Sequence, residues 1–348
     1  MSVTIYESAG FDPAPPSALE TCHLPTDQDD LHKYLETMDV VGRRIISGQT
    51  SYYLEIGRPT GSFQAEVTFG PLGTSSPVKA RCLGLTQSVH GSTETKVHEM
   101  QTAAFPQHTV VTIGNNGIDT KKSRDSATRR ETAVERHSLL RILGAPGAPV
   151  SLSGTSYGGQ PAYDIAEYNL DCANPIAIDS LVLHAPGVLS PESSRPIADR
   201  EFIPALAVTT LSALMRMGTA ASIQTVQDLA CGKFDMGSRY GSVVHLVQEA
   251  LHAGVTMATR HDAVLHHAAL LRDGTPAERL QRVVANTAVR VILYCDDPLA
   301  RGHDWKQIVG PDNIDYLPGG HEGTFSYIDT FTALRNAYEK IPAIKPAA

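Results

Sequence analysis

The most informative stretch of this chain for its fold is Val150-Ser151-Leu152-Ser153-Gly154-Thr155-Ser156-Tyr157-Gly158-Gly159. Its first four residues predict a short strand, which opens into the pattern Gly-x-Ser-x-Gly around Ser156. A serine at the tip of a sharp strand-to-helix turn has an exposed hydroxyl, and its crowded backbone requires small residues two positions away on each side. Gly154 and Gly158 meet that requirement. The pattern also arises by chance, so its interpretation depends on the rest of the sequence.

Two later segments carry the residue types that a reactive serine needs. Residues 289–294 read as a buried strand, followed by Asp296 and Asp297. Residues 313–317 predict another short strand, and the glycine-rich loop after it carries His321. Imidazole titrates near neutral pH, so a histidine can remove the serine proton and later return it.

The chain order of serine, aspartate and histidine, each just past a strand, is the order of α/β-hydrolases. The sequence resembles that superfamily over roughly residues 50–340. The resemblance implies that Ser156 is the nucleophile and His321 the general base. It implies that Asp297 orients His321, with Asp296 as the alternative acid. Family members often carry Gly-x-x-Asp at this point, and the run at residues 294–297, with Tyr in place of Gly, favours Asp297.

Three other histidines compete with His321 for the role of the base. They are His90, His184 and His303, and each is better explained as a structural or surface residue. No metal site is expected, because His261, His266 and His267 do not share one helical face.

The resemblance also implies an oxyanion hole made of backbone N–H groups. One donor should be Tyr157, the residue after the nucleophile. The other should follow the strand predicted over residues 80–86, where many family members have His-Gly. This chain has Thr-Gln-Ser there, so Gln87 is the first choice and Ser88 the alternative.

Strand and helix patterns alternate along most of the chain, which predicts a mostly parallel sheet covered by helices on both faces. The expected architecture is an eight-stranded α/β-hydrolase sheet. Residues 46–185 and 287–348 form its core, after an N-terminal extension over 1–45 with a short helix near 31–41.

The alternation breaks over residues 186–286, where the pattern is mainly helical. We expect a helical cap there, because the slot before the strand of the acid commonly carries one in this superfamily. A second packed subdomain without a gating role is the alternative. The expected helices are 203–217, 223–229, 242–252 and 261–271.

Composition sets the remaining limits. The 348 residues are 42% hydrophobic, and 29 Lys plus Arg stand against 37 Asp plus Glu, a net charge of −8. This acidity argues against nucleic-acid partners. No apolar run is long enough to span a membrane, no signal peptide is recognised, and the five scattered cysteines fit reduced thiols, so a cytoplasmic protein is expected. A homo-oligomer is compatible with the sequence.

The implied function is cleavage of a carboxylic ester or thioester through an acyl-enzyme, with a small acyl substrate as partner and no cofactor. Two alternatives stay open. The same residues could transfer the acyl group to an alcohol or amine, or the fold could serve as a catalytically silent receptor or binding module, because one fold hosts many functions.

Overall fold

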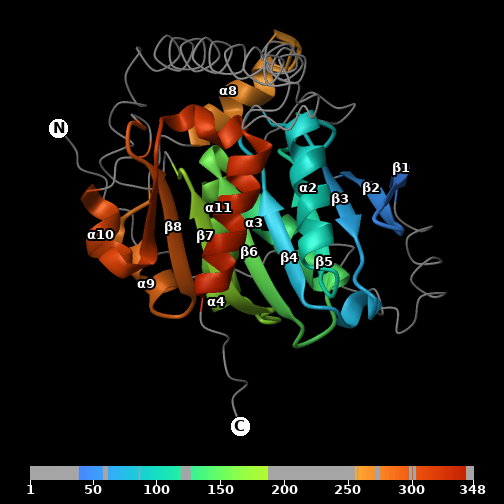
Figure 1. Ribbon diagram of the computed structural model, residues 1–348, viewed down its shortest axis with the longest axis horizontal. Helices are drawn as coiled ribbons and strands as arrows, with labels where there is room; N and C mark the ends of the chain where they lie inside the picture. Colours follow the sequence, from blue (N-terminus) through green and yellow to red (C-terminus); the bar gives the residue numbers. More distant parts are fainter. Residues whose placement is uncertain are drawn as a thin grey trace, which may run out of the picture.

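The computed structural model describes residues 39–57, 62–85, 87–118, 127–186, 255–256, 258–270, 275–297, 300 and 303–341. Nine strands in these ranges form one sheet with the order β1-β2-β3-β5-β4-β6-β7-β8-β9 (Figure 1). The strands are β1 (Asp39–Ile46), β2 (Gln49–Gly57), β3 (Ser62–Thr68), β4 (Val78–Cys82), β5 (Thr109–Ile113), β6 (Pro149–Thr155), β7 (Ala177–His184), β8 (Ala288–Tyr294) and β9 (Ile314–Leu317).

The expected mostly parallel α/β sheet is confirmed. Strands β4 to β9 pair in parallel, and β1, β2 and β3 add an antiparallel ribbon that joins the sheet at β5. The sheet has nine strands instead of eight, because residues 39–46 form an edge strand within the region expected to be an extension. The sequence DVVGRRII is rich in β-branched residues, which suits a strand better than the helix expected near 31–41.

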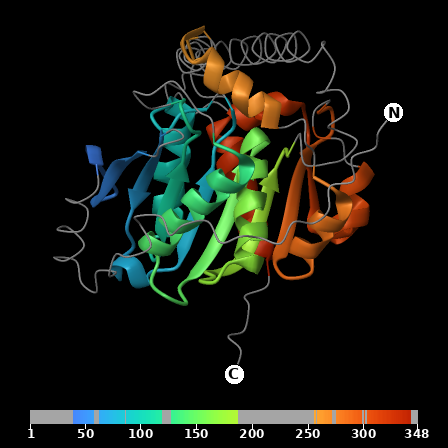
Figure 2. The same ribbon diagram turned by 180° about the vertical axis from the view of Figure 1, so that it is seen from behind.

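Helices cover both faces of the sheet, α2 and α11 on one face and α3, α4, α9 and α10 on the other (Figures 1 and 2). The helices are α2 (Ser92–Ala104), α3 (Arg129–Leu143), α4 (Gly159–Asp171), α8 (His261–Leu270), α9 (Ala277–Val284), α10 (His303–Val309) and α11 (Tyr327–Lys340). Alternating side chains of one strand serve the two layers. Leu181 and Leu183 join the core with α3 and α4, whereas Val182 packs with α11.

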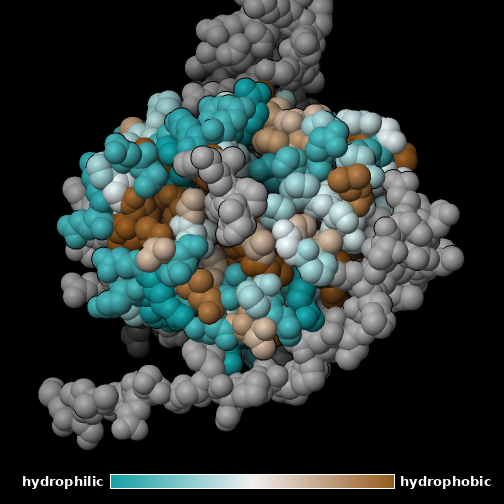
Figure 3. Space-filling view, turned by 90° about the horizontal axis from the view of Figure 1, so that it is seen from below, coloured by the Kyte–Doolittle hydropathy of each residue, from teal (hydrophilic) through white to brown (hydrophobic). Residues whose placement is uncertain are grey.

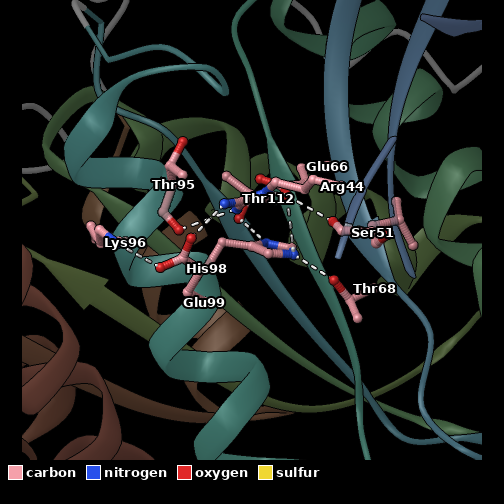
Figure 4. Close-up of polar contacts among 10 residues, drawn as sticks. Arg44, Ser51, Glu66, Thr68, Thr95, Lys96, His98, Glu99 and Thr112 are labelled. Carbon is pink, nitrogen blue, oxygen red and sulfur yellow. Dashed lines mark hydrogen bonds and ion pairs between the residues drawn. The ribbon is translucent and has the colours of Figure 1, made fainter. Parts of the chain in front are cut away.

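A buried polar network fixes α2 to the antiparallel strands (Figure 4). Arg44 of β1 donates to Glu66 at 2.6 Å, and it also donates to Glu99 and to the carbonyl of Thr95, both on α2. His98 of α2 bonds to threonines of β3 and β5 at 2.9 Å each. These hydrogen bonds join the first turns of α2 to β1, β3 and β5, so the start of the helix is held in place on the sheet.

Most of the predicted cap lies outside the described residues, including the helices expected at 203–217, 223–229 and 242–252. The helix expected at 261–271 corresponds to α8, which lies across the carboxyl ends of the parallel strands (Figure 1). Helix α9 also falls within 186–286, but Leu280 and Val283 pack into the main core. The cap therefore stays a prediction. No helix in the described ranges is long and apolar enough to cross a membrane.

Candidate active site

Ser156 lies at the end of β6 in a strained backbone conformation. Its φ is +53°, a conformation that is energetically unfavourable for any residue other than glycine. The surrounding structure must offset that cost. The two flanking glycines make the turn sterically feasible. A Cβ on Gly154 would meet the carbonyl oxygen of Gly158 at 2.1 Å, and one on Gly158 would meet that of Cys82 at 2.2 Å. Both contacts are with backbone, so neither position tolerates a side chain.

The structure brings Ser156, His321 and Asp297 together from three separate strand ends. Ser156 Oγ lies 2.8 Å from His321 Nε2, and His321 Nδ1 lies 2.7 Å from Asp297 Oδ2. An ionised carboxylate only accepts hydrogen bonds, so Nδ1 carries the proton of a neutral His321. Nε2 then has a lone pair toward the serine hydroxyl, which is the tautomer that a general base needs.

Of the two aspartates after β8, Asp297 contacts the histidine. Its carboxylate is buried, and its other oxygen accepts from the backbone N–H of Ala300 at 3.2 Å. Asp296 is exposed, and its backbone N–H donates to the carbonyl of Gly319 in the loop that leads to His321. Asp296 therefore helps to join the two loops through its main chain.

The loop of His321 rests on Tyr294 and His184. A Cβ on Gly323 would overlap the Tyr294 ring, so the glycine allows the loop to lie against that ring. The Tyr294 hydroxyl is 3.0 Å from His184 Nε2. Burial, together with the nearby charge of Arg81, lowers the pKa of His184 to about 3, so His184 is neutral. A pKa this low makes His184 a much weaker base than an ordinary histidine, and its ring packs as a support for Tyr294.

The other two competing histidines lie on other elements of the fold. His90 hydrogen-bonds to Gln64 Oε1 at 2.7 Å and packs on the ring of Tyr53. His303 is the first residue of α10.

The loop after β4 differs from the expectation for the second oxyanion donor. The backbone N–H of Gln87 donates to the carbonyl of Gly84 at 3.1 Å and so closes a turn. The Gln87 side chain accepts from the N–H of Gly84 at 2.6 Å and donates to the carbonyl of Thr324 in the histidine loop at 3.3 Å. Ser88 begins the next turn, in which its hydroxyl accepts from the N–H of His90. Gln87 thus holds the loop together, and its N–H is engaged.

Sequence reasoning missed a contact between α8 and the residue after the nucleophile. The Tyr157 hydroxyl is 2.7 Å from His267 Nδ1, and His267 Nε2 is 2.9 Å from the carbonyl of Asn116. Because a carbonyl only accepts, Nε2 carries the proton and Nδ1 accepts from Tyr157. The helical pattern of α8 was recognisable in the sequence, but the partner of His267 lies 110 residues away.

The described residues hold no candidate metal centre beside this site. No group of three or more His, Cys, Asp or Glu side chains there could hold a metal ion. A cavity of about 310 Å³ lies at the start of β6, between the end of α3 and the loop before β7. That is the opposite edge of the sheet, where hydrophilic and hydrophobic residues lie side by side (Figure 3).

Comparisons with known proteins identify the fold. No family model and no curated protein sequence matches the chain. Three of the solved structures that do match are a thioesterase domain from the curacin biosynthetic pathway, an α/β-hydrolase enzyme from a deep-sea metagenome library, and a serine hydrolase involved in carbazole degradation.

The thioesterase domain is 17% identical, with a TM-score of 0.50 over 82% of this chain and 98% of its own. The metagenome enzyme is 16% identical, with a TM-score of 0.50 over 88% of this chain and 100% of its own. The carbazole-pathway hydrolase is 14% identical, with a TM-score of 0.51 over 82% of this chain and 99% of its own. At these identities the likeness shows the fold alone, and the chain has the α/β-hydrolase fold.

Proposed function

We propose that this protein is a serine hydrolase that cleaves carboxylic esters or thioesters. One observation carries the proposal: a strained serine whose hydroxyl is 2.8 Å from a histidine, which is itself 2.7 Å from a buried carboxylate. A serine hydroxyl is a weak nucleophile until a neighbouring base removes its proton. Strain and burial at one point of a sheet edge are typical of a functional site.

In the proposed reaction, Ser156 Oγ attacks the carbonyl carbon of the substrate while its proton passes to His321 Nε2. The carbonyl π electrons move to oxygen and give a tetrahedral oxyanion. Asp297 stabilises the imidazolium that forms. Collapse of the intermediate breaks the bond to the leaving alcohol or thiol, which takes the proton from His321. Water then attacks the acyl carbonyl carbon while His321 takes its proton. Collapse of the second tetrahedral intermediate breaks the bond to Ser156 Oγ, which takes the proton back from His321, and the acid is released.

For the oxyanion we propose two backbone donors, the N–H groups of Tyr157 and Leu85. Leu85 replaces Gln87, whose N–H is engaged in the turn with Gly84. Leu85 and Tyr157 belong to one buried apolar cluster, so the loop and the elbow are in contact. Within the described ranges, no hydrogen bond from the N–H of Leu85 is present. Ser88 remains the alternative, but it lies one turn further from Gly84.

Esters and thioesters differ in the leaving group, an alcohol or a thiol, and the proposed mechanism accepts either one. The solved structures with the same fold include a thioesterase domain and a serine hydrolase, which supports the hydrolase class. The apolar residues around Tyr157, among them Leu85 and Val264, favour an acyl group with an apolar portion.

The test is covalent labelling with a fluorophosphonate, measured by intact-mass spectrometry. The wild type should gain one adduct, and Ser156→Ala should gain none while it unfolds at a similar temperature. Turnover of a panel of ester and thioester substrates should fall on the order of 10⁶-fold in Ser156→Ala. An unlabelled but folded wild type, or activity retained by Ser156→Ala, would contradict the proposal and favour a binding role for the fold.

A further inference from the structure

The side chain of Asn115 holds one peptide group of the loop after β4. Its Nδ2 donates to the carbonyl oxygen of Gly84 at 2.7 Å and lies 3.4 Å from that of Leu83. The backbone N–H of Gln87 donates to the same Gly84 oxygen at 3.1 Å. The carbonyl of the peptide between Gly84 and Leu85 is therefore fixed by two donors.

A fixed carbonyl also fixes the N–H of the same peptide. The peptide unit is planar and trans, so the N–H of Leu85 points away from the side on which Asn115 and Gln87 bind. That N–H is the one proposed above as an oxyanion donor. The end of β4 lies against the elbow, because the Leu83 carbonyl oxygen is 2.5 Å from where a Cβ on Gly158 would be. The peptide that Asn115 orients therefore directly follows a carbonyl that packs against the serine elbow.

Asn115 is itself held firmly. It directly follows β5 and Gly114, and its side chain is buried, with 1% exposed. The guanidinium of Arg136, also buried, donates to the carbonyl of Gly114 at 3.0 Å. The carbonyl of Asn115 accepts from the N–H of Ile118 at 3.3 Å. A buried donor with fixed neighbours keeps its direction.

We propose that Asn115 is a positioning residue for the oxyanion hole, acting through the Gly84–Leu85 peptide. The inference rests on the proposed hydrolase function. Its consequence is specific: the loss of Asn115 should weaken the binding of the tetrahedral oxyanion and leave the binding of the uncharged substrate nearly unchanged. Interactions made only in the transition state change kcat, whereas uniform binding changes KM.

The test compares Asn115→Asp with Asn169→Asp. Aspartate is nearly isosteric with asparagine, but it lacks the N–H donor and repels the Gly84 oxygen when ionised. Asn169 is the matched control, because its Nδ2 donates to the carbonyl of Ile176 at 3.0 Å in a loop at the other edge of the sheet. The substitution removes two amide-to-carbonyl contacts at the buried Asn115 and one at the half-buried Asn169. Thermal unfolding is therefore measured for both variants, and kcat is compared at a temperature at which both are folded.

Removal of a whole oxyanion donor costs about 10²–10³-fold in kcat, so a misdirected one should cost roughly 10- to 100-fold in Asn115→Asp, with KM changed less than about threefold. The affinity for a trifluoromethyl ketone, which forms a tetrahedral oxyanion on the serine, should fall by the same factor as kcat/KM. Asn169→Asp should keep kcat within about twofold of the wild type.

An unchanged kcat in folded Asn115→Asp would overturn the inference, as would an equal loss in Asn169→Asp. If Asn115→Asp does not fold, Asn115→Ala, which removes the donor without adding a charge, takes its place in the same comparison. Failure of the hydrolase proposal is distinguishable, because the wild type would then neither label nor turn over substrate.

Discussion

Acidification from about pH 7.5 to about pH 5 should destabilise the protein in part because His184 cannot take up a proton while it is buried. The ring is fully buried at the end of β7, and burial together with Arg81 and His321 lowers the pKa of His184 to about 3. In the unfolded chain the same histidine has an ordinary pKa of about 6.5. The unfolded state therefore binds the proton first as the pH falls.

The size of the effect follows from this difference. A depressed histidine pKa contributes stability that is complete above about pH 6.5 and is lost as the pH falls toward the folded value. At about pH 5 the loss from His184 is about 2 kcal/mol, and near pH 7.5 it is negligible. His98, whose pKa burial also lowers far below its usual value, acts in the same direction. Burial raises the pKa of Glu66 and Asp164, which act in the opposite direction.

Because several groups titrate, the measurement is a difference between two proteins. Free energies of unfolding of the wild type and of His184→Phe are measured by urea denaturation at both pH values. Phenylalanine keeps the ring packing against Tyr294 and removes the titration, and the lost hydrogen bond costs the same at both pH values. The stability advantage of the wild type should shrink by about 2 kcal/mol at the lower pH. An advantage that stays constant would refute the assignment of a buried, neutral His184.

Two further pairs of substitutions test the surroundings of the nucleophile. Asp297→Asn should lower kcat about 10⁴-fold, because the amide favours the wrong tautomer of His321. Asp296→Asn, at an exposed side chain, should change kcat less than about tenfold. Steady-state kinetics compare the two variants. Gly158→Ala should destabilise the fold by more than about 3 kcal/mol, because the new Cβ would overlap the backbone carbonyl of Cys82. Gly159→Ala should cost less, because its Cβ would be 3.1 Å from a side-chain carbon of Pro186. Thermal unfolding compares the two variants.

The parts of the fold that the sequence predicted are those with local signals. Helix α3 (Arg129–Leu143) carries such signals, with a capping box at its start and Gly144 after its end. The edge strand Asp39–Ile46 was missed although it is rich in β-branched residues, because its glycine and two arginines interrupt the apolar pattern and its pairing with β2 is a tertiary contact. Pairing of that kind depends on tertiary contacts and leaves little trace in a short segment.

The candidate site divides along the same line. The serine, the acid and the histidine could be listed from the sequence, because parallel strands end at one edge and each residue follows such a strand. The preference for Asp297 over Asp296 rested only on matching residues 294–297 to the family pattern Gly-x-x-Asp, in which a shift of one residue would select Asp296. The second oxyanion donor could not be predicted, since the turn that engages the N–H of Gln87 depends on the direction of the chain after β4. The contact of His267 with Tyr157 depends on how α8 docks, which no local pattern records.

The strained serine and the oxyanion loop form one packed unit, which constrains how either can change. The positive φ of Ser156 is tolerated because Gly158 fits against the carbonyls of Cys82 and Leu83. Those carbonyls belong to the backbone that continues into the Gly84–Leu85 peptide. Any substitution that pushes β4 away from the elbow therefore relaxes the serine and moves the proposed donor at the same time. We expect the effects of such substitutions on kcat to be strongly non-additive with those at Asn115, because the two act on one peptide.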